Sequence, residues 1–420
     1  MIGLIDGNNF FVSCERVFNP SLLGIPVLVL SNNDGCIVAR SNEVKKLGIK
    51  MGTPFFKIES LIEKYNIQVF SSNLSLYGDM SDRMMQVFSG FVKDLEVYSI
   101  DECFLDLNGY NKYHDLKTYG KEIISATKKN IGIPASLGIA ATKTLAKVAS
   151  KFAKKYPSYE GVCMIDTEEK RTKALKLIQV EDIWGIGSQY SKILNYNGVK
   201  SAFDFTLKKE SWVRKYLKVQ GVRTWKELLG EKCYDLETNP LNKQNICTSR
   251  SFGEMVNDYE TLTEAVANFA AACARKLREQ NSCASMLTVF ILTNRFREDL
   301  PQYFESKTII LPTPSNLSGE LISTARNALQ LIYKKGYSYK KAGVTVSQIV
   351  PSDQVQLSLW DEKDRVKLQR IYNTVDRMNQ KNGMNRIKMA VQGNNKKWHL
   401  KNEHISRLYT TSWDDLITIQ

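Results

Sequence analysis

Histidine is scarce in this sequence, and cysteine occurs without the spacing of a binding motif. The three histidines are too few and too scattered for a histidine-containing metal site or a Ser-His-Asp hydrolase. The eight cysteines show none of the paired spacings of zinc or redox motifs. We therefore expect reduced thiols that serve as small core residues. The histidines are His114, His399 and His404, and the cysteines are Cys14, Cys36, Cys103, Cys163, Cys233, Cys247, Cys273 and Cys283.

Long hydrophobic runs are also missing. The longest apolar stretches, such as residues 265–274 and 26–30, fall well short of the about 20 residues that a membrane-spanning helix needs. The N-terminus lacks a basic segment followed by an apolar one, and its first apolar run already carries Asp6. These features predict a cytosolic protein.

The chain of 420 residues is too long for one hydrophobic core and predicts two to four domains. Its net charge of +14 is distributed unevenly. Residues 1–166 contain 19 Lys and Arg against 17 Asp and Glu, so most of the positive surplus lies in the rest of the chain. A basic surplus can simply maintain solubility, but this distribution favours a polyanionic partner such as nucleic acid.

Residues 98–107, with the sequence YSIDECFLDL, predict a tight antiparallel hairpin. Its arms would be residues 98–100 and 103–107, with Asp101 and Glu102 where they meet. Two adjacent carboxylates cannot be buried together without a positive group nearby. An acidic pair in a turn is usually just solvated, so this segment alone does not indicate a site.

The N-terminus strengthens the case for a site. Residues 2–5 predict a buried strand that ends at Asp6 and turns into the aromatic pair Phe10 and Phe11. Three carboxylates on neighbouring strand ends suit two Mg²⁺ ions about 3.5–4 Å apart, which catalyse phosphoryl transfer. Asp106, on the returning arm, is expected to point away from this site and is left out.

Four segments carry a family resemblance: DGNNFF at residues 6–11, SNNDGCIVAR at 31–40, YSIDE at 98–102 and GIAATKTLAK at 138–147. Together they resemble the Y-family translesion DNA polymerases, and within them the UmuC branch, which includes the catalytic subunit of bacterial DNA polymerase V. The likeness runs nearly end to end. It implies error-prone, template-directed synthesis across lesions in the SOS response, without a proofreading domain.

The resemblance implies a multidomain α+β fold with the right-hand architecture of a polymerase, with palm, small fingers and helical thumb. The alternation of strands and helices in residues 1–166 independently predicts α+β. The predicted strands are 2–6, 27–30, 36–39, 98–107, 135–140 and 162–165, and the predicted helices are 10–17, 42–47, 76–91, 116–130 and 142–155. A β-α-β-β-α-β pattern is visible in residues 246–350, including a helix over 262–279 with Thr261 and Glu264 at capping-box spacing. A linker is predicted at 238–243. The implied domains are a palm (1–22 and 78–166), fingers (23–77), a thumb with a helix-hairpin-helix (167–237), a little finger (244–350) and a tail (351–420).

The resemblance also assigns roles around the carboxylates. Two Mg²⁺ ions would be held by Asp6, the backbone carbonyl of Gly7, Asp101 and Glu102. Phe11 would exclude ribonucleotides as a sugar gate, whereas Phe10 is the better candidate for the core. Lys45 and Lys154 would contact the triphosphate of the incoming dNTP. Asn42 stands where many relatives have a tyrosine that reaches the phosphates.

Primer-template DNA would contact two further regions. The glycines Gly185 and Gly187 expose backbone N–H groups at a helix N-terminus, which suits a DNA phosphate, although an ordinary helical turn explains them equally well. In the little finger, the candidate DNA contacts are Arg250, Arg295 and Arg297.

The segment Gln356-Leu357-Ser358-Leu359-Trp360 resembles the peptide with which replication proteins bind the sliding clamp. A short apolar peptide more often packs onto its own domain. The resemblance further implies a cleaved UmuD dimer and a RecA filament as partners. A nucleotidyl cyclase with a similar palm and a non-catalytic DNA-binding scaffold remain the alternatives. A cyclase is disfavoured because it has no duplex for a thumb to hold. A scaffold is disfavoured because all three carboxylates are present.

Overall fold

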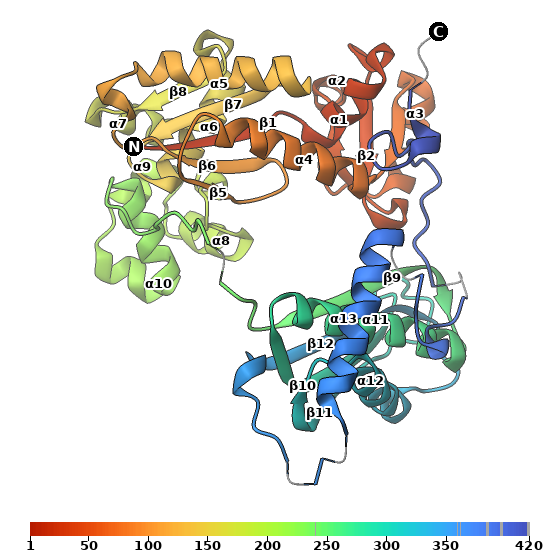
Figure 1. Cartoon of the computed structure of the whole chain (residues 1–420). Helices are drawn as coiled ribbons and strands as arrows, with labels where there is room; N and C mark the ends of the chain where they lie inside the picture. Colours follow the sequence, from red (N-terminus) through yellow and green to blue (C-terminus); the bar gives the residue numbers. More distant parts are fainter. Residues whose placement is uncertain (240, 359, 362, 384–385, 395–397, 418–420) are drawn as a thin grey trace. The chain divides into compact units, whose positions relative to one another are not determined.

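The computed structural model describes residues 1–239, 241–358, 360–361, 363–383, 386–394 and 398–417. The chain divides into two compact units (Figure 1). Unit 1 comprises residues 1–31, 35–240 and 404–420, and unit 2 comprises residues 32–34 and 241–403. The division at residues 240 and 241 falls inside the segment 238–243 for which the sequence predicts a linker. Among the described residues, no helix is long and apolar enough to cross a membrane.

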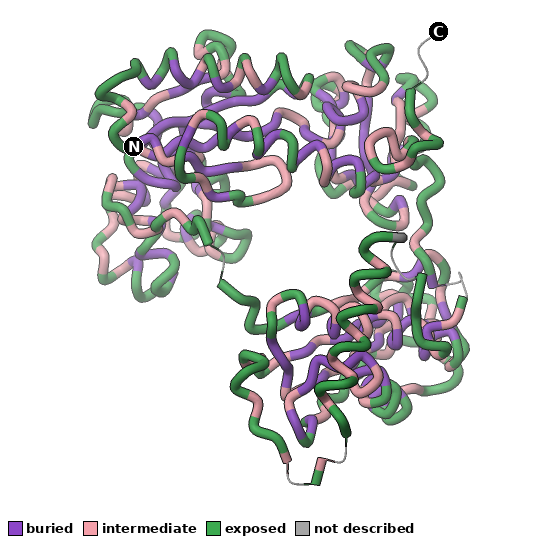
Figure 2. Tube along the Cα trace, in the orientation of Figure 1, coloured by how far each residue is buried: buried purple, intermediate pink, exposed green. Residues whose placement is uncertain are grey.

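A five-stranded sheet in the order β5-β6-β1-β7-β8 forms the centre of unit 1. β1 lies in the middle, antiparallel to both neighbours, and only the β7–β8 pair of this sheet is parallel. Every residue of β1 and β7 is buried (Figure 2). The strands are β1 Ile2–Gly7, β5 Leu95–Val97, β6 Glu102–Asp106, β7 Ala135–Ala140 and β8 Val162–Ile165.

The two faces of this sheet belong to different hydrophobic clusters, because successive side chains of a strand point to opposite sides. Leu4 and Phe104 pack with helix α6 and the helices that follow it. Ile5 and Cys103 pack with helices α1, α4 and α5. The helices of these clusters are α1 Phe10–Phe18, α4 Leu74–Ser89, α5 Leu116–Ile131, α6 Lys143–Lys155, α7 Glu168–Leu177, α8 Ser188–Tyr196, α9 Ala202–Thr206 and α10 Glu210–Leu228.

Helix α6 approaches β7 closely at Gly138. A Cβ atom at this position would lie 2.1 Å from the backbone N of Ser150 and 2.3 Å from the carbonyl O of Ala146. Such distances are far inside van der Waals contact, so only glycine permits this approach. The N-terminus of α6 is capped by the Thr142 side chain and by the buried Glu227 of α10, whose carboxylate accepts the N–H of Thr144 at 2.9 Å.

A smaller three-stranded sheet in the order β3-β2-β4 completes unit 1, with two short helices and its own hydrophobic cluster. The sequence predicts β2, β3 and α2 but not α3 and β4. Residues 59–71 mix polar and apolar positions in segments of seven and four residues, too short for either periodicity to stand out. The elements are β2 Val27–Leu30, β3 Ile37–Arg40, α2 Asn42–Lys46, α3 Glu59–Tyr65 and β4 Gln68–Ser71.

Unit 2 has the predicted β-α-β-β-α-β order, in a sheet arranged β11-β10-β12-β9. The expected capping box is wrong, because the first helix begins earlier: Asp258 is its N-cap and accepts the N–H of Thr261 at 2.7 Å. A helix, α13, follows the sheet and was not predicted. The elements are β9 Ile246–Val256, α11 Tyr259–Glu279, β10 Ser282–Thr293, β11 Phe304–Ser315, α12 Ser318–Ile332, β12 Tyr339–Pro351 and α13 Arg365–Asn382.

Two further expectations need correction. The first arm of the predicted hairpin is β5, so residues 98–101 form the turn rather than a strand. The hydroxyl of Ser99 accepts the N–H of Glu102 at 3.1 Å and thereby closes this turn. All eight cysteines are free thiols, but they are not all core residues, because Cys247 is exposed and Cys36 and Cys233 are only partly buried.

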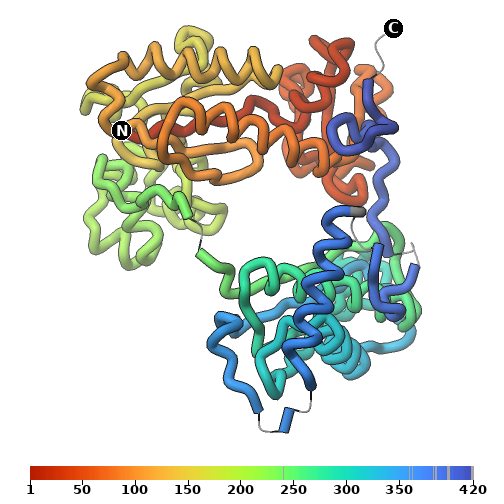
Figure 3. Tube along the Cα trace, in the orientation of Figure 1, coloured from red at the N-terminus to blue at the C-terminus, as the bar shows by residue number. Residues whose placement is uncertain are grey.

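The C-terminal segment 404–417, named here the return segment, belongs to unit 1 although residues 241–403 belong to unit 2. Figure 3 shows it in dark blue beside the red and orange elements of unit 1. Ser71 at the end of β4 donates its N–H to the carbonyl of His404 at 2.9 Å, and its hydroxyl accepts the N–H of His404 at 2.9 Å. Residues more than 300 positions apart in sequence therefore lie side by side.

Candidate active site

The three predicted carboxylates come from the adjacent ends of β1 and β6. Asp6 and Glu102 are directly opposite in the antiparallel register. The N–H of Gly7 donates to the carbonyl of Asp101 at 2.9 Å, which fixes the turn against the end of β1. The Ser99 hydroxyl donates to Asp101 Oδ1 at 2.6 Å. The structure therefore brings together the residues predicted from two separate motifs.

Helix α6 places lysines over this strand edge. Lys147 Nζ lies 2.8 Å from Glu102 Oε2, and the Lys154 ammonium pairs with the Asp6 carboxylate. The two lysines are seven residues apart, or about two helical turns, so they project from the same face of α6. One turn earlier, the buried Lys143 pairs with Glu96 of β5. No role was predicted for Lys147 from the sequence. Its seven-residue spacing from Lys154 would have placed both lysines on one face of the helix.

The electrostatics of Asp6 reflect its crowded position. Burial is the largest influence and raises the pKa of Asp6 to about 7. The Lys154 ammonium acts in the opposite direction, while the neighbouring charges of Glu102 and Asp101 raise the pKa further. Three mutually repelling carboxylates at one strand edge are favourable partners for a cation.

These carboxylates are the hard oxygen donors that Mg²⁺ prefers, so the residue types fit the implied ions. Their side chains are nevertheless engaged by Lys154, Lys147 and Ser99. Within the described part of the chain, no group of three His, Cys, Asp or Glu side chains is arranged to hold a metal ion. A metal ion at this edge would compete with the two lysines for the carboxylate oxygens.

Asp106 lies outside the site, as expected, but for a different reason. Side chains two and four residues apart along a strand share a face, so Asp106 does not point away from the face of Glu102. It pairs with Ile2 at the opposite end of β1, about 13 Å along the strand. Its Oδ1 accepts the N–H of Asn108 at 2.8 Å. Distance, rather than direction, separates it from the other carboxylates.

Lys45 of α2 reaches the loop that follows β1. Its Nζ donates to Asn9 Oδ1 at 2.5 Å and to Asn42 Oδ1 at 3.2 Å. Burial lowers the pKa of Lys45, and the positive charges of Arg40 and Lys154 lower it further. The predicted triphosphate residues Lys45 and Lys154 are thus close enough to repel each other. Asn42, the departure from the family pattern, helps to hold Lys45.

The two aromatic residues after β1 have different environments. Phe10 is buried, with an exposed fraction of 3%. Phe11 is half-buried and stacks on Tyr77 of α4, with ring centroids 4.4 Å apart and an interplanar angle of 15°. The Tyr77 hydroxyl donates to Glu15 Oε1 at 2.7 Å. Sequence reasoning missed Tyr77 and Glu15, because nothing in their local pattern marks them.

Two aromatic side chains lie beside Lys147. Lys147 Nζ is 4.3 Å from the ring centroid of Tyr98 and 5.5 Å from that of Trp184, within the range of cation–π attraction. Trp184 Nε1 donates to the Tyr98 hydroxyl at 3.0 Å. Trp184 directly precedes Gly185, so this contact joins the acidic turn to the predicted DNA-binding glycines.

The other predicted contacts are dispersed. Gly185 has a positive φ of 88°, and Gly187 directly precedes α8. In unit 2, Arg250 on β9 is exposed, and Arg295 and Arg297 are exposed in the loop between β10 and β11. Arg297 is already paired with Asp299 at 2.5 Å.

The predicted clamp peptide lies between β12 and α13. Gln356 is exposed, Leu357 is 58% exposed and Trp360 is 88% exposed. Leu359 lies outside the described residues. Leu357 lines a cavity with residues of α13, so part of the peptide already contacts its own unit.

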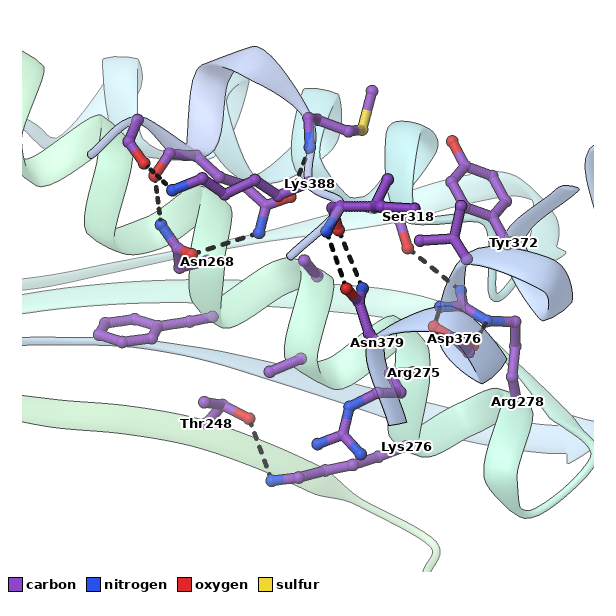
Figure 4. A pocket seen from close by; sticks show the side chains of 18 of the residues that line it. Thr248, Asn268, Arg275, Lys276, Arg278, Ser318, Tyr372, Asp376, Asn379 and Lys388 are labelled. Atoms are coloured by element: carbon purple, nitrogen blue, oxygen red, sulfur yellow. Dashed lines mark hydrogen bonds and ion pairs between the residues drawn. The ribbon is translucent and has the colours of Figure 1, made fainter. Parts of the chain in front are cut away.

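A cavity of about 820 Å³ lies in unit 2 between α11, α13 and the segment that follows α13. Figure 4 shows basic residues along it, including Arg278, whose guanidinium faces Asp376. Arg278 Nε lies 2.6 Å from Asp376 Oδ2, and Lys276 Nζ lies 3.3 Å from the Thr248 hydroxyl. These polar groups already have protein partners, and none of the predicted carboxylates lines this cavity.

Comparison with known families gives matches along most of the chain. The impB/mucB/samB family matches residues 5–151, and the impB/mucB/samB family C-terminal domain matches residues 243–359. Residues 369–419 match a domain of unknown function (DUF4113). The chain is 40% identical over 422 residues to "Protein UmuC" of Salmonella typhimurium, with 100% of both chains covered.

Two solved structures are similar in fold. One is described as "Y-family DNA polymerase chimera Dbh-Dpo4(243-245)-Dbh", with a TM-score of 0.66, 21% identity and coverage of 84% of this chain and 100% of that chain. The other is described as "Insertion ternary complex of Dbh DNA polymerase", with a TM-score of 0.55, 21% identity and the same coverage.

Proposed function

The chain belongs to the impB/mucB/samB family and to its UmuC group, and from this relationship we propose that it is an error-prone, template-directed Y-family DNA polymerase that copies across lesions. The observation that supports the proposal most directly is the meeting of Asp6, Asp101 and Glu102 at one edge of the central sheet. The substrates are primer-template DNA and a dNTP. We further propose that this synthesis takes place in the SOS response.

Two Mg²⁺ ions would be held by Asp6, the Gly7 carbonyl, Asp101 and Glu102. When bound, they would activate the primer hydroxyl and stabilise the leaving pyrophosphate. Lys154 and Lys147 neutralise the carboxylates in the structure described here. Lys154 would exchange its carboxylate partner for the triphosphate, where Lys45 supplies a second positive charge. Tyr77 supports the ring of Phe11, which would lie against the deoxyribose and exclude a 2′-hydroxyl.

The domain roles follow the same proposal. The palm would comprise residues 1–22 and 78–166, the fingers residues 23–77, the thumb residues 167–237 and the little finger residues 244–350. The thumb would hold the duplex through Gly185 and Gly187, and the little finger through Arg250, Arg295 and Arg297. The clamp peptide at Gln356–Trp360, a cleaved UmuD dimer and a RecA filament are the proposed partners. A cyclase would need neither duplex-binding region, and a scaffold would not need three retained carboxylates.

Primer extension tests the proposal. The protein is incubated with Mg²⁺, four dNTPs and a primer on an intact template or one with an abasic site, with and without clamp, cleaved UmuD and RecA filament. We expect extension on the intact template and insertion opposite the abasic site, both lost in Asp101→Asn. No incorporation under any combination, or equal incorporation by Asp101→Asn, would exclude the polymerase assignment to this site.

A further inference from the structure

The return segment is attached to unit 1 by specific contacts. Phe18 of α1 stacks on Tyr409, with ring centroids 4.9 Å apart and an interplanar angle of 4°. Asn73, the buried N-cap of α4, donates through Nδ2 to the Ser406 hydroxyl at 3.0 Å and to the Arg407 carbonyl at 3.1 Å. Together with the pairing of Ser71 and His404, these contacts hold the segment at three places.

One contact of the return segment reaches a buried acid. The Ser406 hydroxyl donates to Glu15 Oε1 at 3.0 Å. The same oxygen accepts the Tyr77 hydroxyl at 2.7 Å. Glu15 is 2% exposed and Tyr77 is fully buried, so water cannot readily replace either donor. Burial raises the pKa of Glu15, whereas both hydroxyl bonds lower it. Removal of either hydroxyl therefore takes from Glu15 Oε1 a hydrogen bond that water cannot readily replace.

The chain of contacts continues to the proposed sugar gate. Tyr77 presents its hydroxyl to Glu15 and its ring face to Phe11, with the centroids 4.4 Å apart. The position of the Tyr77 ring is set by the hydroxyl bond at one end and by packing around it. A sugar gate works by steric exclusion, so a shift of its supporting ring by a fraction of an ångström changes the room for a 2′-hydroxyl.

We propose that the return segment positions the sugar gate: Ser406 fixes Glu15, Glu15 fixes Tyr77, and Tyr77 holds Phe11 against the incoming sugar. This gives a role to the end of the domain of unknown function, which covers residues 369–419. The inference rests on the proposed function of Phe11. Ser406, Glu15 and Tyr77 are positioning residues, since they act on the substrate only through Phe11.

The test measures incorporation of one rNTP and the matching dNTP by the full chain on the same primer-template. Ser406→Ala removes one donor to Glu15, and Tyr77→Phe removes the other while keeping the ring. Loss of one such hydrogen bond predicts a rise in the rNTP to dNTP ratio of about three- to tenfold in each variant. The double variant should show less than the product of the two effects, because both act through Glu15.

Ser412→Ala is the matched control, because Ser412 lies in the same segment and its side chain makes no capping hydrogen bond. It should leave the ratio unchanged. If Ser406→Ala lowers dNTP and rNTP incorporation equally, the segment only stabilises the fold, and the proposal is wrong.

A second comparison separates this proposal from the assignment on which it rests. Phe11→Ala should raise the ratio strongly. If Phe11→Ala raises it but Ser406→Ala and Tyr77→Phe do not, the coupling proposal fails while the gate assignment stands. If the parent protein extends primers but Phe11→Ala leaves the ratio unchanged, the gate assignment fails, and the coupling proposal fails with it. If the parent protein extends no primer with any combination of clamp, cleaved UmuD and RecA filament, the polymerase proposal fails, and the coupling proposal fails with it.

Discussion

Lys154 of α6 and Asp6 of β1 form an ion pair at the edge of the central sheet. Both residues are assigned to the same reaction, but to different partners, since Asp6 would bind metal and Lys154 the triphosphate. A metal ion would compete with Lys154 for the Asp6 carboxylate, and a triphosphate would compete with Asp6 for the Lys154 ammonium. Substrate binding is therefore expected to replace one set of charge pairs by another rather than to fill a site without counter-charges.

The carboxylates give the first prediction. Asp6→Asn and Asp101→Asn should each lower nucleotide incorporation by about 10³-fold or more, because metal stabilisation supplies several kcal/mol of the barrier reduction. Duplex binding should be largely retained, since the proposed DNA contacts lie elsewhere. Asp106→Asn is the control on the same strand and should incorporate normally. Near-normal single-nucleotide incorporation by either site variant would refute the metal assignment.

Lys154 gives the second prediction. Lys154→Ala should raise the KM for dNTP by about tenfold, equivalent to about 1.4 kcal/mol, because a charged contact to the triphosphate is lost. Lys155→Ala changes the neighbouring exposed lysine and should have little effect. Steady-state kinetics on a fixed primer-template measures both. An unchanged KM in Lys154→Ala would mean that this lysine serves only to neutralise Asp6.

The aromatic pair gives the third prediction. Phe11→Ala should keep dNTP incorporation within about tenfold, a barrier change of about 1.4 kcal/mol, while ribonucleotide incorporation rises strongly. Phe10→Ala should instead lower the free energy of unfolding by about 3–5 kcal/mol, because Phe10 is buried. Gel assays with dNTP and rNTP pools, together with denaturant unfolding, distinguish the two effects. Rejection of rNTPs by Phe11→Ala at the parental level would show that Phe11 is not the gate.

The exposed peptide gives the fourth prediction. Replacing Gln356, Leu357 and Leu359 together by alanine should weaken binding of the sliding clamp and clamp-stimulated synthesis, because an apolar anchor is removed. Incorporation without clamp should change little. Ser358→Ala, within the same peptide, is the control. Equal capture of clamp by the parent and the triple variant would show that the peptide serves its own unit, where Leu357 already lines a cavity.

The contact between β7 and α6 gives the fifth prediction. Gly138→Ala should destabilise the protein by about 1–3 kcal/mol or more, because the added methyl group would overlap the backbone of α6. It should also lower activity by displacing the helix that carries Lys147 and Lys154. Gly78→Ala, in α4 with open space around it, should be neutral or stabilising by up to about 1 kcal/mol. Thermal unfolding of both variants provides the comparison, and equal melting temperatures would contradict the steric argument.

The sequence by itself determined the elements whose signals are local. Alternation and apolar runs located β1, β7 and β8, helical periodicity located α5 and α6, and the order of elements in unit 2 followed from the same patterns. The acidic residues were recognisable because Asp6 closes an apolar run and Asp101 and Glu102 lie where two apolar arms meet. The elements α3, β4 and α13 were missed, since α3 and β4 are only seven and four residues long and the described residues of α3 and α13 include no buried one.

Only the tertiary structure decided which residues meet. The pairing of Asp6 with Glu102 depends on the strand order, and the pairing of Lys154 with Asp6 depends on the approach of α6 at Gly138. The contact between Glu15 and Ser406 joins positions 391 residues apart. A single sequence carries no local signal for such contacts, because their free energy arises from burial and desolvation once the chain has folded.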